Sequence, residues 1–115
     1  MSIPDFSESE LWLIRQTLEE RYGEPREIEL ADAEVRIHPE ERELTECPVV
    51  VWQDPETDAT FVVFKLGADG YRAQFFYRGY QQYGLADKNF DDLAECVVTI
   101  LQVQVDHEVK HRAEQ

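Results

Sequence analysis

The clearest pattern of hydrophobic and polar positions lies between Thr60 and Tyr80. Two runs rich in Phe, Val and Tyr flank Gly67-Ala68-Asp69-Gly70, whose glycines supply the positive φ that a tight connection needs. The pattern predicts a β-hairpin. Because two strands bury too little apolar surface to be stable alone, further strands and a covering layer are expected elsewhere in the chain.

A helical pattern precedes this hairpin. Ser7 and Glu10 form a capping box, and Gly23 is suited to end the helix. Between them an apolar residue recurs every three or four positions, at Leu11, Ile14, Leu18 and Tyr22. This spacing predicts an amphipathic helix whose apolar stripe faces the sheet, with Trp12 beside the stripe.

Residues 26–38 alternate in hydrophobicity, as a strand does, but the alternation changes phase. Ile28 and Leu30 point one way, whereas Ala33, Val35 and Ile37 continue one residue out of step. The change predicts either a bulge at Ala31-Asp32 within one strand or a tight turn that makes a hairpin. Both alternatives remain open at this stage.

The remaining elements complete the predicted architecture. Pro48 is expected to open a strand that turns at residues 54–58 and pairs with the hairpin. Asn89 is expected to cap a long helix that runs to the C-terminal residues. The sequence thus predicts a single α+β domain over residues 1–115: an N-terminal helix, a four- to five-stranded, mostly antiparallel meander and a long C-terminal helix, with both helices packed on one sheet face.

The net charge of −14 limits the partners that the protein can bind. Nucleic acids and anionic membrane surfaces are held by Lys and Arg, so we expect no direct binding to either. Residues 1–46 hold 14 acidic and 5 basic side chains, whereas residues 47–115 hold 11 and 6. This asymmetry is compatible with a surface that meets a basic protein partner, but an acidic surface also favours solubility without any partner. The polar N-terminus and the lack of a long apolar run predict a cytoplasmic protein.

Tyrosine and arginine gather around the segment GYQQYG at residues 79–84. These residue types give a large contact area at modest entropic cost and are typical of interfaces. We therefore interpret five residues as a candidate interface: Arg72, Tyr77, Arg78, Tyr80 and Tyr83. The alternative is that the tyrosines form a packed loop over the sheet edge.

One short motif raises a second hypothesis. His107-Glu108-Val109-Lys110-His111 resembles the H-E-x-x-H motif of zincin metalloproteases, in which two histidines bind zinc and the glutamate activates water. The resemblance implies a small zinc-dependent hydrolase that uses His107, Glu108 and His111. Against it, zincins take a third ligand from beyond the motif, where only Arg112 to Gln115 follow here. We therefore expect no catalytic residues and no cofactor, with zinc as the alternative.

These observations favour a non-catalytic protein-interaction domain. Its charge suggests an inhibitor or immunity-type protein that neutralises a basic partner. Homodimerisation through the open sheet edge or the tyrosines is equally compatible with the sequence. Cys47 and Cys96 lack a C-x-x-C spacing and are expected to be packed thiols.

Overall fold

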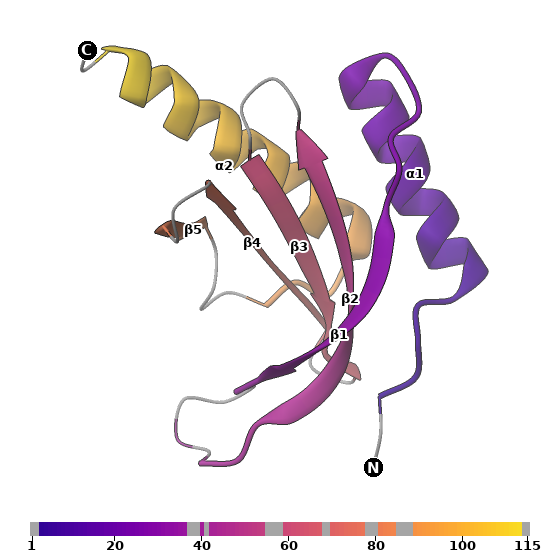
Figure 1. Cartoon of the computed structure of the whole chain (residues 1–115). Coiled ribbons are helices and arrows are strands. Elements are labelled where there is room, and N and C mark those ends of the chain that lie inside the picture. The colour runs from indigo at the N-terminus through magenta and orange to yellow at the C-terminus, as the bar shows by residue number, and fades with distance from the viewer. Residues whose placement is uncertain are drawn as a thin grey trace.

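The computed structural model describes residues 3–36, 40, 42–54, 59–67, 70–77, 81–84 and 89–113. Its elements in chain order are α1 (Glu8–Tyr22), β1 (Glu29–Val35), β2 (Thr45–Asp54), β3 (Ala59–Lys65), β4 (Tyr71–Tyr77), β5 (Gln81–Gly84) and α2 (Leu93–Ala113). The strands form one antiparallel sheet in that same order, and both helices cover one of its faces (Figure 1). The predicted α+β meander between two helices is confirmed.

Local signals set both ends of α1. The Ser7 hydroxyl oxygen accepts a hydrogen bond from the Glu10 N–H at 3.1 Å, and the Glu10 carboxylate accepts one from the Ser7 N–H at 2.8 Å. At the other end Gly23 adopts φ +76° and donates its N–H to the Glu19 carbonyl at 2.8 Å. The predicted capping box and glycine terminus are confirmed, because each depends only on neighbouring residues.

The main core lies between the helices and the sheet. Trp52 stacks on Phe61 with ring centroids 5.2 Å apart, and Phe61 lies 5.9 Å from Phe75, so one aromatic row crosses β2, β3 and β4. The helices cover this row with buried apolar side chains, among them Ile14, Leu18, Val97 and Ile100. Each such side chain contributes roughly 1.5–3 kcal/mol on burial, so this layer holds both helices to the sheet.

The predicted hairpin joins β3 to β4. The pairs run from Thr60 opposite Phe76 to Lys65 opposite Tyr71. Gly67 and Gly70 adopt φ +68° and +87°, as the sequence predicts for this connection. Ala68 and Asp69 lie outside the described residues.

Residues 29–35 form a single continuous strand, so the predicted bulge and the predicted hairpin are both wrong. Glu29 pairs with Val51, Val35 pairs with Thr45, and the register between them is uninterrupted. The apolar residues change phase because Leu30 is not a core residue: its side chain is 61% exposed. Ala33 and Val35 pack instead against the cluster on the other sheet face.

The next strand, β2, begins three residues earlier than expected, at Thr45 rather than Pro48. Pro48 is tolerated inside the strand because β3 pairs with β2 only from Val49 onward. At Pro48 the sheet therefore has a neighbour on the β1 side alone, and the missing N–H removes no bond to β3.

The start of α2 also differs from the prediction. Asn89 does not cap it; Asp92 does, accepting hydrogen bonds from the Ala94 and Glu95 N–H groups at 2.8 and 3.4 Å. Phe90 explains the shift, because its N–H and carbonyl pair with Tyr71 at 2.7 and 2.8 Å and keep the chain extended. Among the described helices, none combines the length and apolarity needed to cross a membrane.

The sheet curls, so the face away from the helices is concave. The Arg72 guanidinium on β4 donates at 3.0 Å to the carbonyl of Arg36, which directly follows β1, although two strands separate β1 from β4 in the sheet. Figure 1 shows β1 and the start of β2 bending accordingly. A second apolar cluster fills part of this face, with Val49, Val62 and Phe64 at its centre.

The two cysteines belong to different clusters. Cys47 lies on the concave face, and Cys96 lies on α2, within the main core. Both are buried and unbridged, as predicted. Burial raises the pKa of the Cys47 thiol to about 11 and that of Cys96 to about 12, so neither is poised as a nucleophile at neutral pH.

Candidate functional site

The structure describes the side chains of two of the five predicted interface residues and places them on opposite faces of β4. Tyr77 lies on the helix side of β4, whereas Arg72 lies on the concave side. Arg78 and Tyr80 lie outside the described residues, as does the side chain of Tyr83. Tyr77 and Arg72 therefore do not share a surface, and the role of the five residues as an interface stays a prediction.

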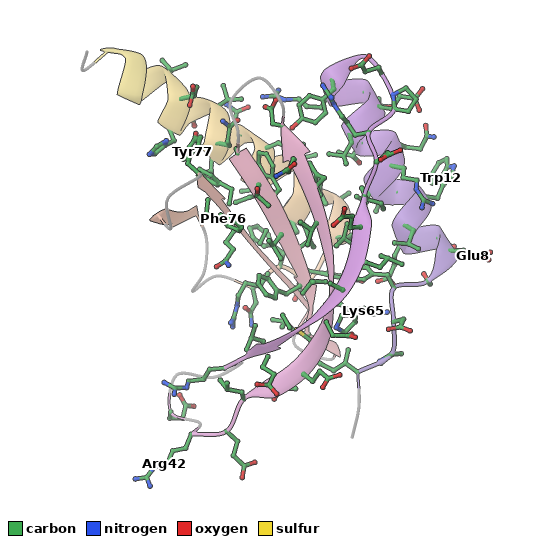
Figure 2. The ribbon with its side chains drawn as sticks, viewed as in Figure 1. Glu8, Trp12, Arg42, Lys65, Phe76 and Tyr77 are labelled. Carbon is green, nitrogen blue, oxygen red and sulfur yellow. The ribbon has the colours of Figure 1, made fainter. Side chains whose placement is uncertain are left out.

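Tyr77 is tied into the contact between β4 and α2. Its hydroxyl donates to the Glu108 carboxylate at 2.9 Å and accepts from the Gln104 amide at 3.1 Å. Its ring stacks on the His107 imidazole, with centroids 5.5 Å apart and planes inclined by 29°. Figure 2 shows Tyr77 directed towards α2. These contacts show that Tyr77 packs β4 against α2.

The same cluster contains the first two residues of the H-E-x-x-H motif. The His107 ring also meets the edge of Phe75 at 5.8 Å, and Glu108 is engaged by Tyr77. The side chain of His111 lies outside the described residues. Across the part of the chain whose placement is given, no three His, Cys, Asp or Glu side chains gather as a metal site. The zinc hypothesis stays a prediction, and it can be tested separately from packing.

We expect His107→Ala to lower the melting temperature equally with zinc and with EDTA, because the substitution removes ring packing against Tyr77 and Phe75. Tyr77→Phe is the matched variant: it keeps the ring and loses the hydroxyl bonds, at about 1–2 kcal/mol of unfolding free energy. Calorimetry and metal analysis provide the measurement. A near-stoichiometric metal whose removal lowers the wild-type melting temperature, and which His107→Ala fails to bind, would contradict the packing account.

Arg72 holds the curled sheet together. Besides the Arg36 carbonyl, its guanidinium donates through Nε to the Asn89 side-chain oxygen at 3.0 Å. It borders a groove of about 420 Å³ on the concave face, with an apolar floor that includes Val49, Val62 and Phe64. Because these floor residues are already buried, the groove exposes little apolar surface to a ligand.

A larger cavity, of about 550 Å³, lies between residues 25–29 and the last part of β2. Its wall includes Arg26, whose guanidinium lies 4.6 Å over the Tyr22 ring and forms an ion pair with Glu24 at 3.5 Å. Asp54 also lines this cavity. Burial, and secondarily the Asp54 charge, raises the pKa of Tyr22, so that hydroxyl stays neutral at physiological pH.

The exposed surface of the first part of the chain is strongly acidic. Among the described residues before Cys47, four basic side chains are exposed (Arg15, Arg21, Arg36 and Arg42) against twelve acidic ones: Asp5, Glu8, Glu19, Glu20, Glu24, Glu27, Glu29, Asp32, Glu34, Glu40, Glu43 and Glu46. The sequence-level charge asymmetry is therefore a property of the surface. We call the exposed acidic residues of α1 and β1 the acidic surface; they are Glu8, Glu19, Glu20, Glu29, Asp32 and Glu34.

Two large apolar side chains lie on the same two elements. Trp12 on α1 is 62% exposed and Leu30 on β1 is 61% exposed. Figure 2 shows Trp12 and Glu8 pointing away from the sheet. In Figure 1, α1 and the start of β1 lie on the side of the molecule opposite β5, and β1 and β5 are the two edge strands of the sheet.

Sequence reasoning placed Trp12 beside the apolar stripe and missed its exposure. The missed signal is local: Glu8, Arg15 and Glu19 lie four, three and seven positions from Trp12 and share its helix face. A tryptophan among charged neighbours on the polar face of a helix is a candidate contact residue, because tryptophan is enriched among the residues that dominate binding energy.

Comparison with protein-family models, with curated proteins and with solved structures finds no match to this chain.

Proposed function

We propose that the protein is a non-catalytic interaction domain of the cytoplasm that binds a basic protein partner through the acidic surface. The excess of exposed acidic over basic side chains before Cys47 carries this proposal. A surface of one charge sign accelerates encounter with a partner of opposite sign and disfavours partners of like sign. An inhibitor or immunity-type protein that neutralises a basic protein is the function that fits this chemistry best.

Trp12 gives the acidic surface a point of attachment that charge alone does not supply. Its ring can bury a large apolar area against a partner, and its acidic neighbours can pair with Lys or Arg around the ring. In this arrangement the aromatic residue supplies affinity, while the carboxylates supply orientation and rapid association. The pairing of exposed charges weakens as salt is added, because ions screen charges beyond about 8–10 Å at physiological ionic strength.

The test compares two variants that each remove three exposed negative charges. One carries Glu19→Gln, Glu20→Gln and Glu29→Gln on the acidic surface; the matched control carries Asp91→Asn, Glu95→Gln and Asp106→Asn outside it. The immobilised proteins are exposed to lysate of the source cells, and the captured proteins are identified. We expect wild type and control to capture the same basic proteins, and the acidic-surface variant to retain about tenfold less.

Two results of the capture experiment would contradict the proposal. If both variants capture the same proteins to the same extent, the acidic surface is not the contact. If the specifically captured proteins are acidic or neutral, the proposed partner class is wrong. Repeating the capture at about 0.5 M salt separates the two contributions, since ion pairs are largely screened there and the contact of Trp12 is not.

A further inference from the structure

The outer edge of β1 is an open sheet edge. β1 is the first strand in the sheet order and pairs with β2 on one side only. Within the part of the chain that the structure describes, no segment pairs with its other side, and the side chains of residues 29–32 are all exposed. Such an edge presents a row of N–H and C=O groups to any extended chain that approaches it.

The position of Pro48 shows which backbone N–H and C=O groups of β1 point away from β2. In an antiparallel pair, residues directly opposite each other either exchange two hydrogen bonds or none. Asp32 lies opposite Pro48, which has no N–H, so this pair cannot be one that exchanges two bonds. The N–H and C=O of Asp32 therefore point away from β2, and by alternation so do those of Leu30 and Glu34.

These three residues also share one side-chain face. Leu30 lies opposite Val50, which belongs to the core under the helices, so Leu30, Asp32 and Glu34 project to the helix side of the sheet, where all three are exposed. The edge thus combines outward backbone groups with one apolar and two acidic side chains. A single added strand can bond to these backbone groups and contact these side chains at the same time.

The edge carries acidic side chains, which protect it against strands of like charge, but it lacks the other devices that prevent strand addition. Natural edges are also protected by lysine, by proline, by a bulge or by a covering segment. β1 contains no lysine or proline, its register is continuous, and its charged side chains are all acidic. A second copy of β1 would bring carboxylates against carboxylates, which is unfavourable across a strand pair, whereas a basic strand would pair favourably.

We propose that β1 is the docking strand for an extended segment of the basic partner, which adds to the sheet as a sixth strand. Lysine or arginine at alternate positions of that segment pairs with Asp32 and Glu34, and the alkyl stem of the next such side chain covers Leu30. Backbone bonds to the outward groups supply affinity, and the alternate side chains supply specificity, as in other cases of strand addition. This inference rests on the proposed function and specifies the form of its partner.

The experiment uses two synthetic peptides of equal charge. One, of about ten residues, alternates lysine with valine; the other has the same number of lysines but proline at regular intervals, so it cannot form a strand. Each is titrated into the wild-type protein, and affinity is measured by calorimetry. We expect the alternating peptide to bind at least about tenfold more tightly than the proline peptide.

Two variants of Asp32 separate the contribution of its backbone N–H to peptide binding from that of its carboxylate. Asp32→Asn removes the carboxylate and keeps the outward N–H; Asp32→Pro removes both, without deleting a bond to β2. We expect Asp32→Pro to lose about tenfold more affinity for the alternating peptide than Asp32→Asn does. Circular dichroism and the melting temperature establish that each variant is folded.

A readout on wild type keeps the test independent of the proline variant. Amide exchange at Leu30, Asp32 and Glu34 should slow when the alternating peptide binds, whereas exchange at Ala31 and Ala33, already bonded to β2, should not change.

Equal binding of the two peptides, with no such alternation in amide exchange, overturns strand addition while leaving charge-based binding intact. Absence of binding by both peptides at low salt contradicts the proposed function as well. A dimer that Asp32→Pro converts to a monomer would assign the edge to a second copy instead.

Discussion

Gly70→Ala is expected to lower the free energy of unfolding by about 3 kcal/mol or more. Gly70 has φ +87°, and a Cβ there would lie 2.2 Å from the Phe90 carbonyl oxygen. That oxygen accepts the Tyr71 N–H at 2.8 Å, so relief of the clash must break the bridge between β4 and the segment before α2. The variant should therefore lose the anchoring of α2 as well as pay the strain of a positive φ.

The neighbouring glycine provides the control. Gly67 has φ +68°, but a Cβ there would meet only the Ile3 side chain, at 3.5 Å. Gly67→Ala should therefore lower the free energy of unfolding by only about 1 kcal/mol, from backbone strain alone. Urea unfolding of both variants measures the difference. Equal losses at the two positions would show that the close approach of Phe90 to Gly70 does not matter.

Glu10→Gln is expected to lower the free energy of unfolding by about 2 kcal/mol at pH 7. The carboxylate joins α1 to the hairpin: it accepts hydrogen bonds from the Ser7 N–H and the Lys65 ammonium, each at 2.8 Å, and from the Tyr71 hydroxyl. Its side chain is 17% exposed, so solvent screens the ion pair only in part. Glutamine keeps the shape and removes the charge on which these three contacts converge.

The effect of Glu10→Gln should depend on pH in a defined direction. Burial of the Glu10 carboxyl would raise its pKa, but the hydrogen bonds from Lys65, Ser7 and Tyr71, with the Lys65 charge, lower it from 4.5 to about 2. A group whose pKa is lower in the folded state stabilises the fold above its unfolded pKa and loses that contribution as pH falls. The difference between wild type and variant should therefore be full at pH 7 and shrink between about pH 5 and pH 2.

Glu8→Gln is the matched control, because Glu8 is an exposed glutamate in the first turn of the same helix. We expect it to change the free energy of unfolding by less than about 0.5 kcal/mol, with little dependence on pH. Unfolding by urea at a series of pH values gives both comparisons. A stability difference for Glu10→Gln that stays constant from pH 7 to pH 2 would contradict the role of the carboxylate charge.

Elements that depend on neighbouring residues were predictable from the sequence. The limits of α1 follow from Ser7, Glu10 and Gly23, and the β3–β4 hairpin follows from glycines between two apolar runs. The start of α2 was not predictable in this way. Asn89 and Asp92 are both good caps, and only the pairing of Phe90 with Tyr71, a contact between distant segments, selects Asp92.

The error at β1 has a similar cause. Apolar residues usually mark the core, so the apolar Leu30, which is exposed, produces a false change of phase in the pattern. Whether a side chain on an edge strand is covered depends on where the helices lie, which the alternation does not encode. The continuous register with β2 gives the correct interpretation.

The charge of the acidic surface was predictable from the sequence, but its arrangement at the sheet edge was not. The acidic excess before Cys47 is present in the sequence, and the structure places most of it in solvent. The sequence does not specify that β1 forms the sheet edge or that Asp32 lies opposite Pro48 with its backbone groups outward, because both depend on strand order and register. The packing of Tyr77 against His107 and Glu108 likewise depends on how α2 crosses β4.

The most direct test of the proposed function is an NMR map of amide shifts as the alternating lysine–valine peptide is added to the wild-type protein. We expect the shifts to concentrate on α1 and β1, around Trp12 and Asp32, and to diminish as salt is added. Shifts concentrated at the α2 end near His107, or on the concave face near Arg72, would contradict the proposed function and place the binding surface elsewhere.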